Sequence, residues 1–282
     1  MIGGALTTDT EDLQRVEFES LVARHDGCAT FARVLDGLRG RDQLLRMLSR
    51  YVEFNSVFGG GVARLSGEIV ARQGLFKAED DDVELLMDRN VEVAAGIFVA
   101  AVDEFDGFAR GPRATHRALA QGTLRVAARF LGFTGAAIDG IGAVNEATRA
   151  AVERVLEGYG LTAPLDRRGL IRALGFHMAS ERLASEEFST LDRYLCVQHP
   201  ALVEYLRSTI LDLNGRRCDA YLWIARHADR EICHFEAALG AANQALRHWA
   251  GPEPRARVKE WMLGGFTEFA ALQAEFMGRL MD

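Results

Sequence analysis

The sequence predicts an all-α protein, and three observations carry that prediction. Apolar residues recur at three- and four-residue intervals along most of the chain. Only five of the 282 residues are proline, and the background is rich in Ala, Leu and charged residues, which favour helix. No stretch alternates β-branched and polar residues as a strand would. A chain of this length buries a sizeable core, so we expect residues 1–282 to form a single domain of roughly eight to ten helices.

In the first half of the chain, caps and glycines set the expected helix limits. Asp9 or Thr10 is the expected cap of the first helix, and Asp42 of a long one. Residues 59–61 are three successive glycines, which predict a kink or the close approach of another backbone. Acidic residues 79–82 suit the positive end of a helix dipole. The expected helices cover residues 10–25, 30–38, 42–73, 79–105 and 112–131.

The second half begins with a small-residue connection over residues 133–141. Asp166 is the expected cap of a strongly apolar helix, and Pro200 the expected start of another. The Asn214-Gly215 pair predicts a turn. The expected helices cover residues 143–159, 166–196, 200–213, 221–249 and 258–280.

Composition and charge exclude several classes of protein. The net charge of −7 argues against nucleic acid as a partner. No apolar run approaches the roughly 20 residues that cross a bilayer, and no basic segment followed by an apolar run opens the sequence, so neither a membrane nor a secretory signal is expected. The cysteines form no C-x-x-C pair, which favours a reducing, cytoplasmic location. They are Cys28, Cys196, Cys218 and Cys233.

The strongest chemical signal lies between Tyr221 and Leu239. His227, Glu231 and His234 stand at relative positions 0, 4 and 7, which stack on one face of a helix. Two imidazoles and a carboxylate on one face form a ligand set for iron, manganese or zinc. The alternative is that two histidines fall at helical spacing on a partly solvated face. Cys233 lies one step off this face, where we expect a packing residue rather than a ligand.

Glu181 is the second candidate, because it lies in the apolar helix 166–188. A carboxylate on such a helix is costly to bury unless it is paired or bound to a metal. His177, one turn earlier, is expected to support Glu181 or the core rather than to bind a metal. Glu186 and Glu187 are expected to face solvent.

Glu104 and His116 flank a loop that would let them converge. The alternatives are a solvated acidic cluster of Glu104 with Asp103 and Asp106, and a surface helix start for His116. Three carboxylates and three imidazoles would together suit two first-row metal ions about 3.5–4 Å apart, bridged by a carboxylate and open to dioxygen. The full set is Glu104, His116, Glu181, His227, Glu231 and His234.

With these residues the chain resembles the haem-oxygenase-like dimetal oxidases, a family of non-haem di-iron enzymes. The likeness covers residues 41–242 and rests on a D-E-x-x-G segment, a later histidine, a central glutamate and a closing H-x-x-x-[DE]-x-x-H. The D-E-x-x-G segment holds Asp103, Glu104 and Gly107. In this family the order Glu, His, Glu, His, Asp or Glu, His supplies both metal sites, which assigns all six residues as metal ligands and catalytic residues. The chain departs from the family in having Glu231 where Asp is common, and in its longer interval from Glu104 to His116, which keeps Asp103 and Asp106 as alternatives to Glu104.

The resemblance implies a haem-oxygenase-like helical bundle with two Fe(II) ions and dioxygen as co-substrate. It implies an oxygenase acting on a small amine or amino acid in specialised-metabolite biosynthesis, with N-oxygenation preferred. Oxidative C–C cleavage or desaturation at the same site is an alternative, as is a metal-free small-molecule binding protein of the same fold or a haem oxygenase. A ferritin-like protein would need E-x-x-H twice, and the chain has it once.

The family also implies partners and a further ligand. Its members use an external electron donor in some reactions, and a homodimer is common. Amine-oxygenating members recruit an additional carboxylate, for which Glu53, Glu92 and Asp106 are the candidates.

Overall fold

The computed structural model describes residues 12–77, 89–106 and 111–282, apart from the side chains of residues 229–232. These ranges are mostly helical, which confirms the predicted all-α class. The elements are α1 (Arg15–His25), α2 (Gly27–Gly37), α3 (Arg41–Asn55), α4 (Phe58–Ala71), α5 (Arg89–Glu104), α6 (His116–Phe130), α7 (Ala136–Ile141), α8 (Glu146–Gly158), α9 (Arg167–Gln198), α10 (Pro200–Ser208), β1 (Ile210–Leu213), β2 (Arg216–Asp219), α11 (Leu222–Arg247) and α12 (Arg255–Gly278).

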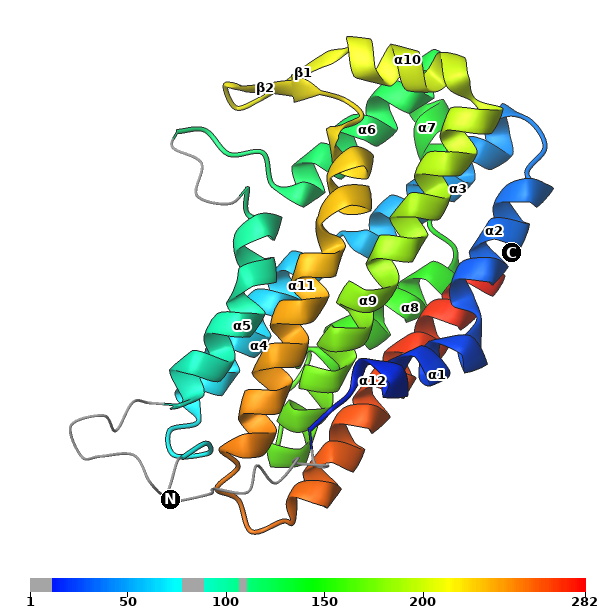
Figure 1. Cartoon of the computed structure of the whole chain (residues 1–282). Coiled ribbons are helices and arrows are strands. Elements are labelled where there is room, and N and C mark those ends of the chain that lie inside the picture. Colours follow the sequence, from blue (N-terminus) through cyan, green and yellow to red (C-terminus); the bar gives the residue numbers. More distant parts are fainter. Residues whose placement is uncertain (1–11, 78–88, 107–110) are drawn as a thin grey trace, which may run out of the picture.

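Three long helices, α9, α11 and α12, form the centre of the bundle (Figure 1). α9 packs against both of the others, α4 and α5 pack against each other beside α11, and α1 and α2 cover α12. The contact of α9 with α12 is unusually close. A Cβ atom at Gly175 would collide with the carbonyl oxygen of Met262, and one at Gly265 with that of Arg172. Glycine at these two positions lets the backbones touch.

A buried apolar cluster runs from α1 to α12 and includes Phe18, Leu174, Trp223 and Phe276. It forms because each of the central helices carries apolar residues at three- and four-residue spacing. Within the described residues, no helix combines the length and apolarity that crossing a membrane requires.

Local signals place several boundaries as predicted. The Asp166 carboxylate accepts a hydrogen bond from the Gly169 amide (2.6 Å) and caps α9. Pro200 occupies the first turn of α10, where its missing N–H costs nothing. Asn214 and Gly215 have positive φ angles of 56° and 88° and turn the chain.

The prediction of a helix over residues 200–213 was wrong beyond Ser208. The chain forms an antiparallel hairpin there, in which Ile210 pairs with Asp219 and Leu213 with Arg216. The Asn-Gly pair explains this, because a two-residue turn with both φ angles positive matches the twist of a hairpin. Leu211 anchors the hairpin because its side chain packs directly against Gly122 of α6. A Cβ atom at Gly122 would collide with it.

The predicted helix over residues 42–73 is two helices, and the break falls at Ser56 and Val57 rather than at the glycines. Residues 59–61 lie inside α4. The groups that approach them closely are side chains, namely Glu104 at Gly59 and the Tyr159 ring at Gly61, and not the backbone that was predicted.

Smaller differences concern helix limits. α2 begins at Gly27, α6 at His116 and α12 at Arg255, and the connection over residues 133–141 contains the short helix α7. Asp9, Thr10 and the acidic residues 79–82 lie outside the described residues.

Candidate metal centre

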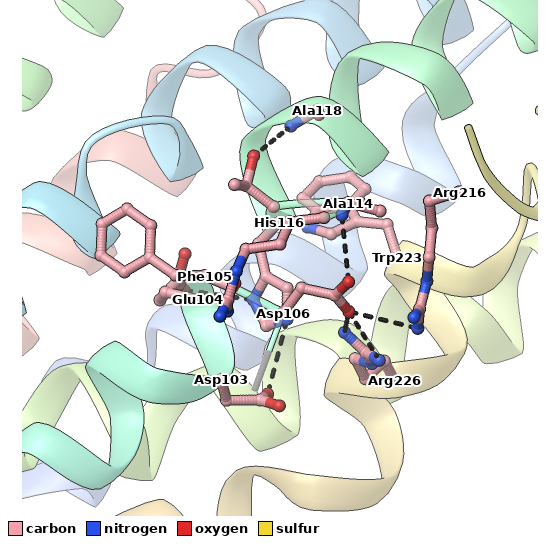
Figure 2. A network of polar contacts seen from close by, with 12 residues as sticks. Asp103, Glu104, Phe105, Asp106, Ala114, His116, Ala118, Arg216, Trp223 and Arg226 are labelled. Carbon is pink, nitrogen blue, oxygen red and sulfur yellow. Dashed lines mark hydrogen bonds and ion pairs between the residues drawn. The ribbon is translucent and has the colours of Figure 1, made fainter. Parts of the chain in front are cut away.

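Three of the predicted ligands meet at one point between helices. Glu104 is the last residue of α5, His116 the first of α6, and His227 lies on α11. One donor atom from each lies within 4.8 Å of the others. His116 and His227 are buried, and their ring centroids are 4.5 Å apart. Figure 2 shows Glu104 and His116 side by side across the gap between α5 and α6.

His116 carries the strongest indication of a missing ligand. Its Nδ1 lies 3.3 Å from Glu104 Oε1 and its Nε2 lies 3.4 Å from Asp103 Oδ2. Neither contact has hydrogen-bond geometry, so both buried nitrogens lack a hydrogen-bond partner among the described residues. Buried polar atoms are nearly always satisfied, and an exception requires an explanation such as an ion. Carboxylate and imidazole groups that face each other without bonding suit a metal between them.

His227 is held in the tautomer that a metal ligand needs. Its Nδ1 lies 2.7 Å from the carbonyl oxygen of Trp223, and since a carbonyl only accepts, Nδ1 carries the proton. Burial, with His116 nearby, holds the pKa of His227 well below its usual range. The ring is therefore neutral, and its Nε2 presents a lone pair.

Glu181 joins a second group of donors to the first. Its Oε2 lies 3.3 Å from His234 Nδ1 and its Oε1 lies 3.3 Å from His177 Nδ1. Asp103 stands between the groups, because its Oδ2 is 3.9 Å from His234 Nε2 as well as 3.4 Å from His116 Nε2. The centre thus draws on α5, α6, α9 and α11.

A short hydrogen-bond chain orients His177, which lies beside Glu181. Ser180 Oγ donates to the His177 carbonyl (2.8 Å) and therefore accepts from Tyr159 Oη (2.8 Å). Tyr159 has a single proton, so its oxygen accepts from His177 Nδ1 at 3.1 Å. The same Nδ1 lies 3.3 Å from Glu181 Oε1, so the hydrogen-bond chain holds the imidazole against the carboxylate. Burial lowers the pKa of His177 and raises that of Tyr159, so both are neutral.

The structure therefore brings together Glu104, His116, Glu181, His227 and His234. The side chain of Glu231 and the residue Gly107 lie outside the described part of the chain. Sequence reasoning treated Asp103 as an alternative to Glu104, whereas both carboxylates face His116. Asp103 and Glu104 are neighbours at the end of one helix, and this sequence signal could have placed both of them in the candidate site.

Two expectations about neighbouring residues were wrong. Glu187 was expected in solvent but is 3% exposed, because α3 and α12 close over this face of α9. Glu186 beside it is half-buried and pairs with Arg182 at 3.1 Å. Cys233 was expected to pack and is exposed.

Asp106 holds the end of α5 close to the start of α6, which explains why Glu104 and His116 converge. It adopts a positive φ of 71° just after α5. Its Oδ2 accepts from the Ala114 amide (3.0 Å), and its Oδ1 pairs with Arg216 of β2 (3.3 Å) and Arg226 of α11 (3.4 Å), as Figure 2 shows. One buried carboxylate thereby fastens the end of α5 to the start of α6.

The other carboxylates proposed as additional ligands lie elsewhere. Glu92 pairs with Arg89 and is three turns before Glu104 on α5, which places it about 18 Å away along the axis. Glu53 is half-buried on α3. Neither is among the described residues that line the cavity beside the centre.

That cavity measures about 40 Å³, enough for a group of a few non-hydrogen atoms. The metal-centre residues Glu104, His116, Glu181 and His227 form part of its wall. The rest is mainly aromatic, with one further carboxylate. Those residues are Phe54, Phe58, Phe188, Trp223, Phe269 and Glu187, together with the small or polar residues Asn55, Ser180 and Ala184.

A scan against protein-family models and a search of curated proteins found no match to the chain. The function must therefore be argued from the geometry. Nitrogen and carboxylate donors without thiolate suit iron, manganese or zinc, and a cavity beside them leaves room for a small reactant.

Proposed function

We propose that the chain is a non-haem di-iron oxygenase with a haem-oxygenase-like fold, which uses dioxygen to oxidise a small amine or amino acid. N-oxygenation is the preferred reaction. The observation that carries the proposal is the meeting of Glu104 with the buried His116 and His227, where neither nitrogen of His116 has a hydrogen-bond partner within the described part of the chain. A hydrolytic zinc site would need fewer ligands than the seven carboxylates and imidazoles that gather here, among which His177 has a supporting role.

The donors divide naturally into two groups. Glu104, His116 and His227 would hold one ion. Glu181 and His234 would hold the other, together with Glu231 as the family resemblance implies. Asp103 faces an imidazole of each group. When bound, iron supplies the electrons and the binding position for dioxygen.

The protein's own contribution is orientation and the exclusion of water. The Trp223 carbonyl and the Phe188 ring fix the His227 imidazole, and the Tyr159 hydroxyl holds His177 in contact with Glu181. Such supporting contacts typically change metal affinity by about 10- to 100-fold. The aromatic wall keeps the reacting group in a dry environment, which strengthens electrostatic interactions in the centre.

Anaerobic loading with ferrous iron tests the proposal. The full chain should take up about two iron ions by elemental analysis, as the donor set for a two-metal site implies. Exposure to oxygen with a panel of amines and amino acids should then consume oxygen, and mass spectrometry should detect a product 16 mass units heavier. Glu181→Ala and His227→Ala should lose both properties. His25→Ala, at the end of α1 and outside the centre, should keep them.

The result also separates the related activities. A product shortened by carbon–carbon cleavage, or two hydrogens lighter, would move the reaction to the alternative classes at the same centre. A chain that takes up no iron would overturn the proposal and favour a metal-free binding protein. Iron uptake that is equal in His227→Ala and wild type would mean that the centre is assigned to the wrong residues.

A further inference from the structure

We propose that Glu187 is the binding site for the ammonium group of the substrate, held against the aromatic wall of the cavity. This inference rests on the proposed function and narrows its substrate class to short molecules that carry a protonated primary amino group in addition to the nitrogen that is oxygenated. It starts from a carboxylate that the metal centre does not use.

Glu187 is buried on α9 and lines the same cavity as the metal-centre residues. Its Oε2 accepts from Tyr51 Oη (3.1 Å) and its Oε1 from Gln273 Nε2 (2.6 Å). A carboxylate has about four acceptor positions, so these two bonds leave capacity for a further donor. An ammonium group brings three N–H donors.

Among the described residues, no positive charge balances the Glu187 carboxylate. Within the described part of the chain, no Lys, Arg or His side chain forms an ion pair with Glu187, and both hydrogen-bond donors are neutral. Burial raises its pKa to about 7. A buried carboxylate without a counter-charge is unfavourable, because its lost hydration is not compensated. A bound cation would remove that penalty, which makes the site selective for charge.

The surrounding wall suits an alkylammonium ion. Phe54, Phe58, Phe188 and Trp223 all line the cavity, and aromatic faces attract cations while they cover apolar carbon. The volume of about 40 Å³ restricts the ligand to a short amine head.

The position of Glu187 relative to the metal centre also suits an anchor for the substrate. Glu181 and Glu187 are six residues apart on α9, which corresponds to about 9 Å along the helix axis. A substrate whose ammonium group is anchored at Glu187 would therefore extend along the cavity and present its second nitrogen, the one that is oxygenated, toward Glu104 and His116.

Binding of propylammonium to the metal-free full chain at pH 8 tests the inference without requiring catalysis. At this pH Glu187 is ionised and the amine is protonated. We expect Glu187→Gln to weaken propylammonium binding at least tenfold in calorimetry, while binding of the neutral analogue 1-propanol stays unchanged. The matched control is Glu186→Gln, which removes a carboxylate of the adjacent, half-buried residue and should bind propylammonium as the wild type does.

Equal binding of propylammonium to wild type and Glu187→Gln, or no binding to the wild type, would overturn the inference. If Glu187→Gln does not fold, Ala184→Leu replaces it as the test, because Ala184 lines the cavity and a larger side chain would fill it. Undiminished propylammonium binding by Ala184→Leu would also refute the site. Iron uptake, measured separately, decides the proposed function, so failure of one is distinguishable from failure of the other.

Discussion

The ring of Phe188 lies against the imidazole of His227, with centroids 4.1 Å apart and planes 21° apart. Trp223 meets the same imidazole edge-on at 5.9 Å, and its carbonyl accepts the Nδ1 proton. Two aromatic rings and one hydrogen bond therefore set the orientation of a candidate ligand. Pre-set ligand orientation is what a metal centre needs from its surroundings.

Removal of the Phe188 ring should affect both stability and metal binding. Phe188→Ala should lower the free energy of unfolding by about 3–5 kcal/mol in urea titrations, as expected for a fully buried aromatic. It should also weaken ferrous iron binding, since His227 can then rotate. Phe98→Ala is the control, because Phe98 is half-exposed and its loss should change stability by less than about 0.5 kcal/mol. Unchanged iron affinity in Phe188→Ala would exclude this supporting role.

Two neighbouring glycines of α4 provide a second matched pair. A Cβ atom at Gly59 would lie 3.1 Å from Glu104 Oε2, whereas one at Gly60 would have no described atom within 4 Å. Gly60→Ala should therefore stabilise the helix by up to about 1 kcal/mol without changing iron affinity. Gly59→Ala must displace the Glu104 side chain and should lower iron affinity about tenfold. Equal affinities in isothermal titration would count against Glu104 as a ligand.

Substitution of Asp106 should loosen the connection between α5 and α6. Asp106→Asn preserves size and tolerates the positive φ, but it leaves Arg216 and Arg226 without their buried counter-charge. We expect a loss of about 3 kcal/mol in unfolding free energy and weaker iron binding. Asp42→Asn breaks an exposed pair with Arg41 and should cost less than about 1 kcal/mol. A similar, small effect of both substitutions would show that Asp106 does not fasten the loop.

The ionisation of Glu187 predicts a pH dependence. Its pKa rises from 4.5 to about 7 on folding, so between these values the folded state binds a proton that the unfolded state lacks. Stability therefore falls as the pH rises from about 4.5 to about 7, and levels off above that. The change amounts to about 3 kcal/mol. Glu187→Gln cannot ionise at this position. Its free energy of unfolding, measured with urea, should therefore rise by about 3 kcal/mol relative to that of the wild type as the pH increases from about 4.5 to about 8. A pH-independent difference would contradict the shifted pKa.

Removal of bound metal should destabilise the wild type. Iron at 100 times its dissociation constant would raise the free energy of unfolding by about 2.7 kcal/mol, and a chelator should reverse this. Differential scanning calorimetry with and without chelator measures the effect. His116→Ala should show no response to the chelator, and a response equal to that of the wild type would remove His116 from the ligand set.

Much of the architecture was predictable because it depends on local signals. The spacing of His227 and His234 predicts one helix face, and Asp166 and Pro200 predict helix starts through the backbone N–H groups that they satisfy or lack. The hairpin after Ser208 was missed because apolar residues there also suit a helix, and the Asn-Gly turn outweighs that preference.

The unpredicted features depend on residues that are distant in sequence. Glu187 is buried because Tyr51 and Gln273 reach it from α3 and α12, and nothing around residue 187 indicates these partners. The need for glycine at positions 59 and 61 has a similar origin, since a side chain there would meet Glu104 or Tyr159. Long-range packing, which a linear pattern does not contain, decides both.

The place of Asp103 between His116 and His234 has a consequence for how the two halves of the centre would fill. The Asp103 carboxylate lies 3.4 Å from His116 and 3.9 Å from His234, so its single negative charge acts on both halves of the centre. Occupancy of one half would then alter the affinity of the other, and stepwise titration would give two unequal dissociation constants instead of one. Asp103→Asn would bring those constants closer together.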